Sequence, residues 1–281
     1  MCSLCLGIGL IFPQNQAQAA TSNPKNTTRY NKVGFLLKGH REGFLDKVYS
    51  PLLMVGQGCG VGIRFAKEKV SSRHWVYIDY SRHPISPADK SLPETINYTI
   101  RGQSVPLSTY PAKTLYVGLR YDYHRLVKTI PKYWLKWYLG GAIDGSFHFY
   151  EAMAGYNDSW ITSYALDLST IVKYGRTCRQ SFEVQLSTSL FSFVQRPPYS
   201  TSTDETKHSS TADYFTKTRP QGVDDNFWIS SLMTYHHSVN CDLDLTLSYR
   251  LSYARSNQPR PVSIISHQIG FGITFLFRPA R

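Results

Sequence analysis

The chain has 281 residues, of which 42% are hydrophobic and 18% are charged, and its formal net charge is +12. No run reaches the roughly 18 apolar residues of a transmembrane helix, so the composition does not fit a helix-bundle membrane protein. Twenty tyrosines and fourteen phenylalanines favour strands over helices.

The N-terminal segment reads MCSLCLGIGLIFPQNQAQAA. Its apolar stretch, 4–12, is too short to span a membrane and is followed by Ala17-Gln18-Ala19, a small-residue cleavage site. We therefore expect 1–19 to be an export signal peptide and 20–281 to form a single domain. No Lys or Arg precedes the apolar run, which is unusual for an export signal. A disordered tail is the alternative.

Removal of the export segment would leave three cysteines, Cys59, Cys178 and Cys241. None of them lies in a Cys-x-x-Cys spacing, so the sequence predicts neither a metal site nor a cofactor. Cys178 and Cys241 are expected near turns two strand spacings apart, which is too far for a disulfide.

Apolar and polar residues alternate over unusually long stretches. Within 113–126, for example, Val117 and Leu119 oppose Arg120 and Asp122. A transmembrane strand needs about 9–11 residues, apolar toward lipid and polar toward the lumen. Nine strands are predicted near 50–66, 73–83, 113–126, 134–150, 159–174, 180–195, 226–239, 242–255 and 263–277. The pattern predicts an all-β fold, a transmembrane antiparallel up-and-down β-barrel; a soluble lipocalin-like barrel is the alternative.

The connections between these strands alternate in length. Bacterial barrels have an even number of strands, with short turns in the periplasm and long loops outside. This order requires a further strand before 50–66, and 32–39 is the candidate, although it is short and Gly39 interrupts it. We therefore expect about ten strands, within a range of 8–12, and both termini in the periplasm. The tightest turn is predicted at 240–241.

The last strand carries a pattern of Gln268, Gly270, Ile273 and Phe275. This pattern resembles the assembly signal of bacterial outer-membrane β-barrel proteins, although the usual terminal aromatic residue is absent. The tyrosine-rich strands are similar to uncharacterised barrels from Bacteroidota. The resemblance implies the outer membrane of a Gram-negative bacterium, with lipopolysaccharide outside and phospholipid inside. Export excludes nucleic acid as a partner.

The segment YHHSVNCDLDL, 235–245, is the first candidate for chemistry. The spacing of His236 and Ser238 is similar to that of lipid A deacylases and outer-membrane phospholipases. Asp242 and Asp244, with His236, are similar to the acidic pair and histidine of the omptin proteases. Those enzymes act at the outer rim, whereas the predicted topology places this segment at a periplasmic turn. His236 and Ser238 are therefore weak catalytic candidates.

A second weak pair lies near an outer loop. Asp144 and His148 are four residues apart on one predicted strand and so share its lumen face. A hydrolase would need such a histidine within hydrogen-bond reach of a nucleophile or water. Whether the chain is an enzyme stays open, with the balance toward a non-enzymatic protein.

Charges of both signs share the predicted lumen face. The cations are Arg64, Arg120, Lys136 and Arg250, and the anions are Asp79, Asp122, Asp144, Asp167, Glu183, Asp242 and Asp244. A ten-stranded barrel is little wider than the eight-stranded size that side chains fill. The mixture predicts a plugged polar lumen, and a narrow channel is the alternative.

Basic residues gather at the predicted periplasmic end, and Arg73 is among them. The four chosen as binding candidates are Lys128, Lys132, Arg176 and Arg179. Such a ring predicts contact with anionic phospholipid headgroups or with an acidic periplasmic or outer-membrane protein partner. Solvated, screened charge is the alternative.

Together these patterns predict an outer-membrane barrel with a structural, assembly or surface-binding role. Loops 84–112 and 196–225 would supply the extracellular contacts.

Overall fold

The computed structural model describes residues 30–46, 53–93, 95–100, 102–108, 112–153, 157–177, 179–195, 219–222, 225–257 and 261–277. The predicted export segment, 1–19, and most of the predicted loop 196–225 lie outside these ranges. Among the described residues the only helix is the 3-10 turn η1 (Pro131–Tyr133). No helix in this part of the chain has the length and apolar character to cross a membrane.

The described residues are nearly all strand. The strands are β1 (Tyr30–Asp46), β2 (Met54–Glu68), β3 (Ser72–Pro87), β4 (Thr95–Ile100), β5 (Gln103–Ser108), β6 (Ala112–Ile130), β7 (Leu135–Met153), β8 (Asn157–Thr177), β9 (Gln180–Gln195), β10 (Arg219–Gln221), β11 (Asn226–Ser238), β12 (Leu243–Ser256) and β13 (Val262–Phe277).

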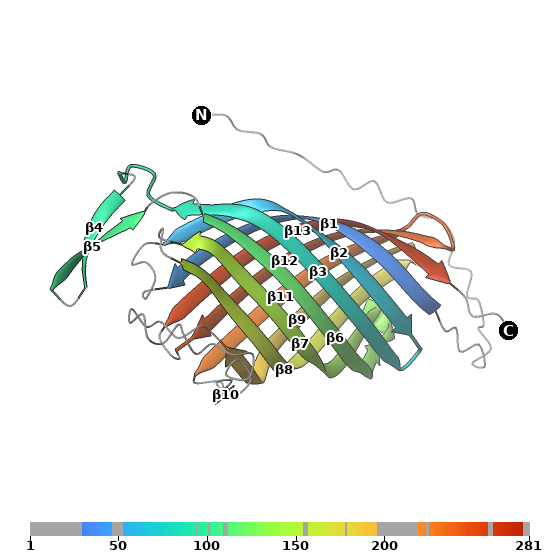
Figure 1. The fold of residues 1–281 in the computed structure, drawn as a ribbon. Coiled ribbons are helices and arrows are strands. Elements are labelled where there is room, and N and C mark those ends of the chain that lie inside the picture. Colours follow the sequence, from blue (N-terminus) through green and yellow to red (C-terminus); the bar gives the residue numbers. More distant parts are fainter. Residues whose placement is uncertain are drawn as a thin grey trace.

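Ten of these strands close into an antiparallel barrel (Figure 1). The order around the wall is β1-β2-β3-β6-β7-β8-β9-β11-β12-β13, and β13 pairs back onto β1. The short strand β10 adds to β9, whereas β4 and β5 form a separate hairpin that projects from one end of the barrel (Figure 1). Closure confirms the predicted fold class and leaves the wall without a free edge.

The first strand is longer than predicted. It runs over Tyr30–Asp46 rather than 32–39, so the expectation that Gly39 interrupts it was wrong. Gly39 lies opposite Ile269 of β13 and Cys59 of β2, in unbroken register with both. Pairing on two sides holds the strand through the glycine, whose intrinsic cost is small beside two ladders of hydrogen bonds.

The connections at one end of the barrel have two to four residues each, whereas those at the other end range from three residues to the two longest of the chain. The short-turn end carries 69–71, 131–134, 178–179 and 239–242, and the other end is called the long-loop end. Strand β1 begins and β13 ends at the short-turn end, where Asn31 pairs with Phe277. This agrees with the prediction that both ends of the barrel chain share one side.

The turn between β11 and β12 differs from the prediction. It has four residues, Val239–Asp242, and the tightest connection in the described chain is instead the two residues between β8 and β9. Val239 donates its N–H to the carbonyl of Leu243 at 2.9 Å, and the Asn240 side chain accepts from the N–H of Asp242 at 2.9 Å. This side-chain turn keeps Asp242 exposed, so the expectation that Asp242 faces the lumen was wrong.

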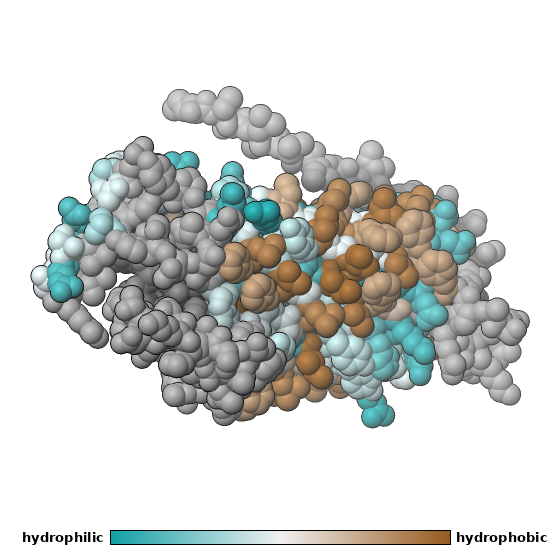
Figure 2. Space-filling view, in the orientation of Figure 1, coloured by the Kyte–Doolittle hydropathy of each residue, from teal (hydrophilic) through white to brown (hydrophobic). Residues whose placement is uncertain are grey.

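The two faces of the wall have opposite polarity. The outward residues are apolar and exposed, for example Leu37 at 68%, Ile143 at 62% and Ile269 at 60%. Figure 2 shows apolar side chains gathered over the barrel wall, with hydrophilic ones toward the short-turn end. The inward residues include many buried charged and hydroxyl side chains. This is the inverse of a soluble barrel and the construction of a transmembrane one.

Candidate functional site in the barrel lumen

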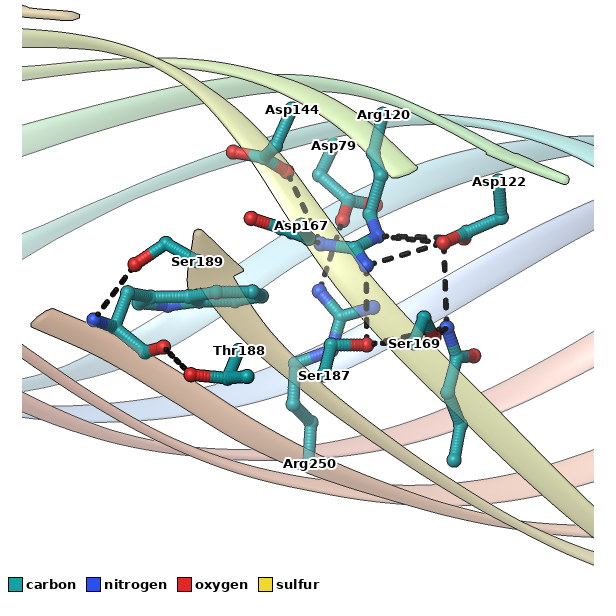
Figure 3. A network of polar contacts seen from close by, with 12 residues as sticks. Asp79, Arg120, Asp122, Asp144, Asp167, Ser169, Ser187, Thr188, Ser189 and Arg250 are labelled. Carbon is teal, nitrogen blue, oxygen red and sulfur yellow. Dashed lines mark hydrogen bonds and ion pairs between the residues drawn. The ribbon is translucent and has the colours of Figure 1, made fainter. Parts of the chain in front are cut away.

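A charge network centred on Arg120 crosses the middle of the lumen (Figure 3). The Arg120 guanidinium, on β6, lies 2.6 Å from Asp167, 3.1 Å from Asp122 and 3.7 Å from Asp144. The three carboxylates come from β8, β6 and β7, and inward alternation along each strand points them at one cation. A single arginine thus contacts three aspartates.

Neighbouring strands complete this Arg120 network. Arg120 also donates to the Ser187 hydroxyl at 3.1 Å, and its guanidinium carbon lies 5.2 Å from the centre of the Trp228 ring. Gln185 donates to Asp122 at 3.3 Å and to Ser169 at 3.0 Å. The contacts therefore extend from β6 through β9 to β11, across the lumen.

Asp79 on β3 anchors the adjoining group of charges. It accepts from Lys38 of β1. It also lies 3.7 Å from Arg250 of β12 (Figure 3). Arg64 of β2 is held differently, because its guanidinium carbon lies 4.8 Å from the ring centre of Tyr77. The predicted balance of charge inside the barrel is therefore present, with cations from β1, β2, β6 and β12.

A second network lies toward the short-turn end. Arg73 contacts Glu68 at 2.8 Å and Glu183 at 2.9 Å, Lys173 contacts Glu183 at 2.8 Å, and Lys32 contacts Glu68 at 3.1 Å. Arg73 lies near the predicted end of the barrel, but it is buried and so does not belong to an exposed basic ring. Its position on β3 points it inward, where two carboxylates offset the cost of burying the cation.

Two larger cavities remain inside the barrel. One, of about 120 Å³, extends to the long-loop end of β11, β12 and β13. The other, of about 650 Å³, opens among the turns of the short-turn end. They have no lining residue in common, and the charge networks lie between them. In the described residues, side chains therefore separate the two ends of the lumen.

The predicted pair Asp144 and His148 lines the smaller cavity. The two side chains do not contact each other. Asp144 faces Arg120, and the His148 ring packs against Tyr116 with ring centres 4.7 Å apart. The Nδ1 atom of His148 is buried without a hydrogen-bond partner.

The predicted pair His236 and Ser238 lines the larger cavity, as residues of one strand face should. The Ser238 hydroxyl donates to Asp244 at 2.6 Å, and the Nε2 atom of His236 lies 3.7 Å from Glu183. Each candidate is thus partnered by a carboxylate, and the described contacts do not join the imidazole to the hydroxyl.

The basic candidates lie where the topology predicts. Lys128, Lys132 and Arg179 are exposed at the short-turn end, and Arg179 also borders the larger cavity. Arg176 belongs to β8, but its side chain lies outside the described ones. Cys59 and Cys241 are free and exposed, and Cys178 is not among the described residues.

The structure also assembles a group that sequence reasoning missed. His40 and Glu42 of β1 and His83 of β3 are all buried, and one ligand-type atom from each lies within 4.8 Å of the others. The signal was a His-x-Glu pair, which shares one strand face. Because the sequence-based prediction ended the first strand at residue 39, it placed His40 and Glu42 outside the barrel.

An apolar outside, a polar inside and a closed antiparallel wall define the chain as a β-barrel of the transmembrane class. No protein-family model matches the sequence, and no curated protein is similar to it.

Solved structures of similar fold are bacterial outer-membrane proteins. One is the outer membrane protease OmpT from Escherichia coli, at 6% identity over 89% of this chain and 97% of that chain, with a TM-score of 0.49. Another is the translocator domain of autotransporter NalP from Neisseria meningitidis, at 10% identity over 88% of each chain, with a TM-score of 0.39. Neisserial surface protein A is 12% identical over 87% of this chain and 97% of that chain, with a TM-score of 0.33.

Proposed function

We propose that this chain is an integral β-barrel of the outer membrane of a Gram-negative bacterium, with a lumen closed to solutes and a non-enzymatic, surface-binding role. The observation that carries the proposal is the Arg120 network. It joins β6, β7, β8, β9 and β11 across the lumen and separates the two cavities. Fixed ion pairs at the middle of a narrow barrel leave no continuous aqueous path.

The membrane assignment rests on the outer face of the barrel. Apolar side chains cover the wall, and burying them in lipid removes them from water. Lipopolysaccharide would contact the half near the long-loop end, and phospholipid the half near the short-turn end. The exposed cations Lys128, Lys132 and Arg179 stand at the level where anionic phospholipid headgroups would lie.

The surface role rests on the β4–β5 hairpin. It belongs to the predicted outer loop 84–112 and stands apart from the barrel at the long-loop end (Figure 1). Thr95, Asn97 and Thr99 are exposed on β4, and within the described part of the chain the two paired strands leave their outer backbone edges free for an added strand. A rigid barrel that presents such a hairpin is suited to binding a partner outside the cell.

Conductance in planar bilayers tests the closed lumen. The wild-type barrel should show no steady single-channel current, whereas Arg120→Ala combined with Asp122→Ala and Asp167→Ala should admit ions through the vacated centre. An Arg125→Ala variant, altered at an exposed residue of the same strand, is the control. Steady current through the wild-type protein would overturn the closed-lumen proposal.

Replacement of 94–109 by a short Gly-Ser linker tests the surface role. The shortened barrel should keep its circular dichroism and thermal unfolding, because among the described residues β4 and β5 pair only with each other. It should lose any partner that copurifies with the wild-type protein from native membranes. Hydrolysis of lipid or peptide by the wild type, abolished by His148→Gln or by Ser238→Ala, would instead establish an enzyme.

A further inference from the structure

We propose that His40, Glu42 and His83 form a divalent transition-metal site inside the barrel, below its long-loop end. One ligand-type atom from each residue lies within 4.8 Å of the others, and Nε2 of His40 is 3.6 Å from a Glu42 oxygen. Tetrahedral zinc with bonds of about 2.0–2.1 Å places its ligands about 3.3 Å apart. Small side-chain movements therefore bring the three atoms around one ion.

The imidazoles lack the partners that a purely structural cluster would have. His83 is 2% exposed, and neither of its ring nitrogens has a hydrogen-bond partner in the described structure. Nε2 of His40 is likewise buried and unpartnered. Buried polar atoms of folded proteins are nearly always satisfied, and a bound cation would satisfy these.

Surrounding contacts hold two of the three ligands, His40 and Glu42. The Nδ1 atom of His40 lies 3.2 Å from the Ser81 hydroxyl, and if this contact takes the Nδ1 proton, Nε2 keeps its lone pair toward Glu42. Tyr150 donates its hydroxyl to the other Glu42 oxygen at 3.3 Å. Metal sites use such outer contacts to fix ligand tautomer and orientation.

The intervening strand is built to let β1 and β3 meet. Gly58 of β2 pairs with His40, and Gly56 pairs with Glu42. A Cβ added to Gly58 would collide with the Cβ of His83, and one added to Gly56 would lie 2.7 Å from its ring. The missing side chains leave room for His83 to lean across β2 toward β1.

The donor set defines the class of ion. Two imidazole nitrogens and one carboxylate oxygen suit Zn²⁺ and its first-row neighbours, whereas Ca²⁺ and Mg²⁺ prefer oxygen donors alone. His40 and Glu42 also line the smaller cavity, whose walls include Asn226, Ser256 and Val262 at the long-loop ends of their strands. This cavity extends from His40 and Glu42 toward the long-loop ends of these strands and has room for a water as fourth ligand.

Zinc titration of tag-free, EDTA-stripped barrel in detergent tests the site. Calorimetry should show one Zn²⁺ per chain, and His40→Gln, Glu42→Gln and His83→Gln should each weaken binding by about 100-fold or more. Ser81→Ala should weaken it by about 10- to 100-fold, as outer-contact losses do. His74→Gln, which alters an outward histidine on the same strand as His83, should leave it unchanged.

Two further measurements distinguish loss of the metal ligands from loss of the fold. Circular dichroism of each variant separates lost binding from lost folding, and the visible spectrum of bound Co²⁺ reports nitrogen and oxygen donors directly. Wild-type protein that binds Zn²⁺ and Co²⁺ no more tightly than folded His83→Gln would overturn the proposal. So would binding that survives Glu42→Gln but is lost in His148→Gln, since the ligands would then be different residues.

Discussion

Two polar clusters of the lumen differ in their contacts: the Arg120 network in the middle, and the His40, Glu42 and His83 cluster nearer the long-loop end. Around Arg120, each carboxylate faces the guanidinium, so that cation and anions hold one another in place. Around His83, the ring nitrogens are buried without partners. A partnered cluster is what a barrel needs for stability, whereas an unpartnered one keeps its lone pairs for a ligand. The middle of the lumen therefore serves stability, and the candidate ligand site lies between it and the long-loop end.

Loss of the central cation should have the largest effect. Arg120→Met would leave Asp122, Asp144 and Asp167 buried without their counter-charge, and breaking such a buried pair costs about 3–5 kcal/mol. Urea unfolding of the barrel from lipid vesicles measures the change. Arg125→Met, at an exposed position of β6, should stay within about 0.5 kcal/mol of wild type. Equal losses in the two variants would show that the network is not what holds the middle of the barrel.

Loss of one charge should destabilise the network at the short-turn end less, because Arg73 there contacts two carboxylates. Glu183→Gln removes one carboxylate from Arg73 and Lys173, but Arg73 keeps Glu68 at 2.8 Å. We expect a loss of about 1.5–3 kcal/mol, the range of hydrogen bonds to charged groups. Asp242→Asn, at an exposed turn carboxylate, is the matched control and should be nearly silent. A loss as large as that of Arg120→Met would mean that Glu68 does not compensate.

The barrel itself could be predicted because its signal is local. Alternation such as Val117–Gly118–Leu119–Arg120 repeats along each strand. The order of short and long connections then required a tenth strand. The end of β1 could not be predicted the same way. Gly39 is a poor strand residue in isolation, and what keeps β1 extended beyond it is pairing with the next strand, β2, and with β13 at the other end of the barrel chain.

The candidate metal site also depends on how the strands pair. His40 and Glu42 share a strand face that the sequence shows, but their meeting with His83 requires the register of β1 on β2 and β2 on β3. It also requires the bare inner face at Gly56 and Gly58. Register is set by the whole sheet, so a single sequence indicated the donors without placing them together.

Two buried histidines of the lumen, His124 and His83, differ in their hydrogen bonds. His124 Nε2 hydrogen-bonds to the Ser169 hydroxyl at 3.0 Å, whereas His83 has no such bond. In EDTA, His124→Leu should cost about 1–2 kcal/mol, and His83→Leu should cost less than about 0.5 kcal/mol or stabilise the barrel. Chemical unfolding of the metal-free proteins measures both. A larger loss for His83→Leu would mean that its ring has a structural role, like that of His124.

The smallest effect on stability is expected at the short-turn end. Lys128, Lys132 and Arg179 are exposed, so reversing all three to Glu should change the free energy of unfolding by no more than about 0.5 kcal/mol per site. Their charge should matter instead for lipid contact, where each basic residue near an anionic surface contributes about 1 kcal/mol.

Insertion rates into vesicles with and without anionic phospholipid measure this lipid contact. The wild type should insert faster when anionic lipid is present, and 1 M salt, with a Debye length of about 3 Å, should remove the difference. The triple variant should lose the preference at low salt while keeping its rate into neutral vesicles. An unchanged preference would mean that these cations are only solvated surface charge. The functional residues of the barrel would then be sought inside the lumen, at the His40, Glu42 and His83 cluster, and not at the short-turn end.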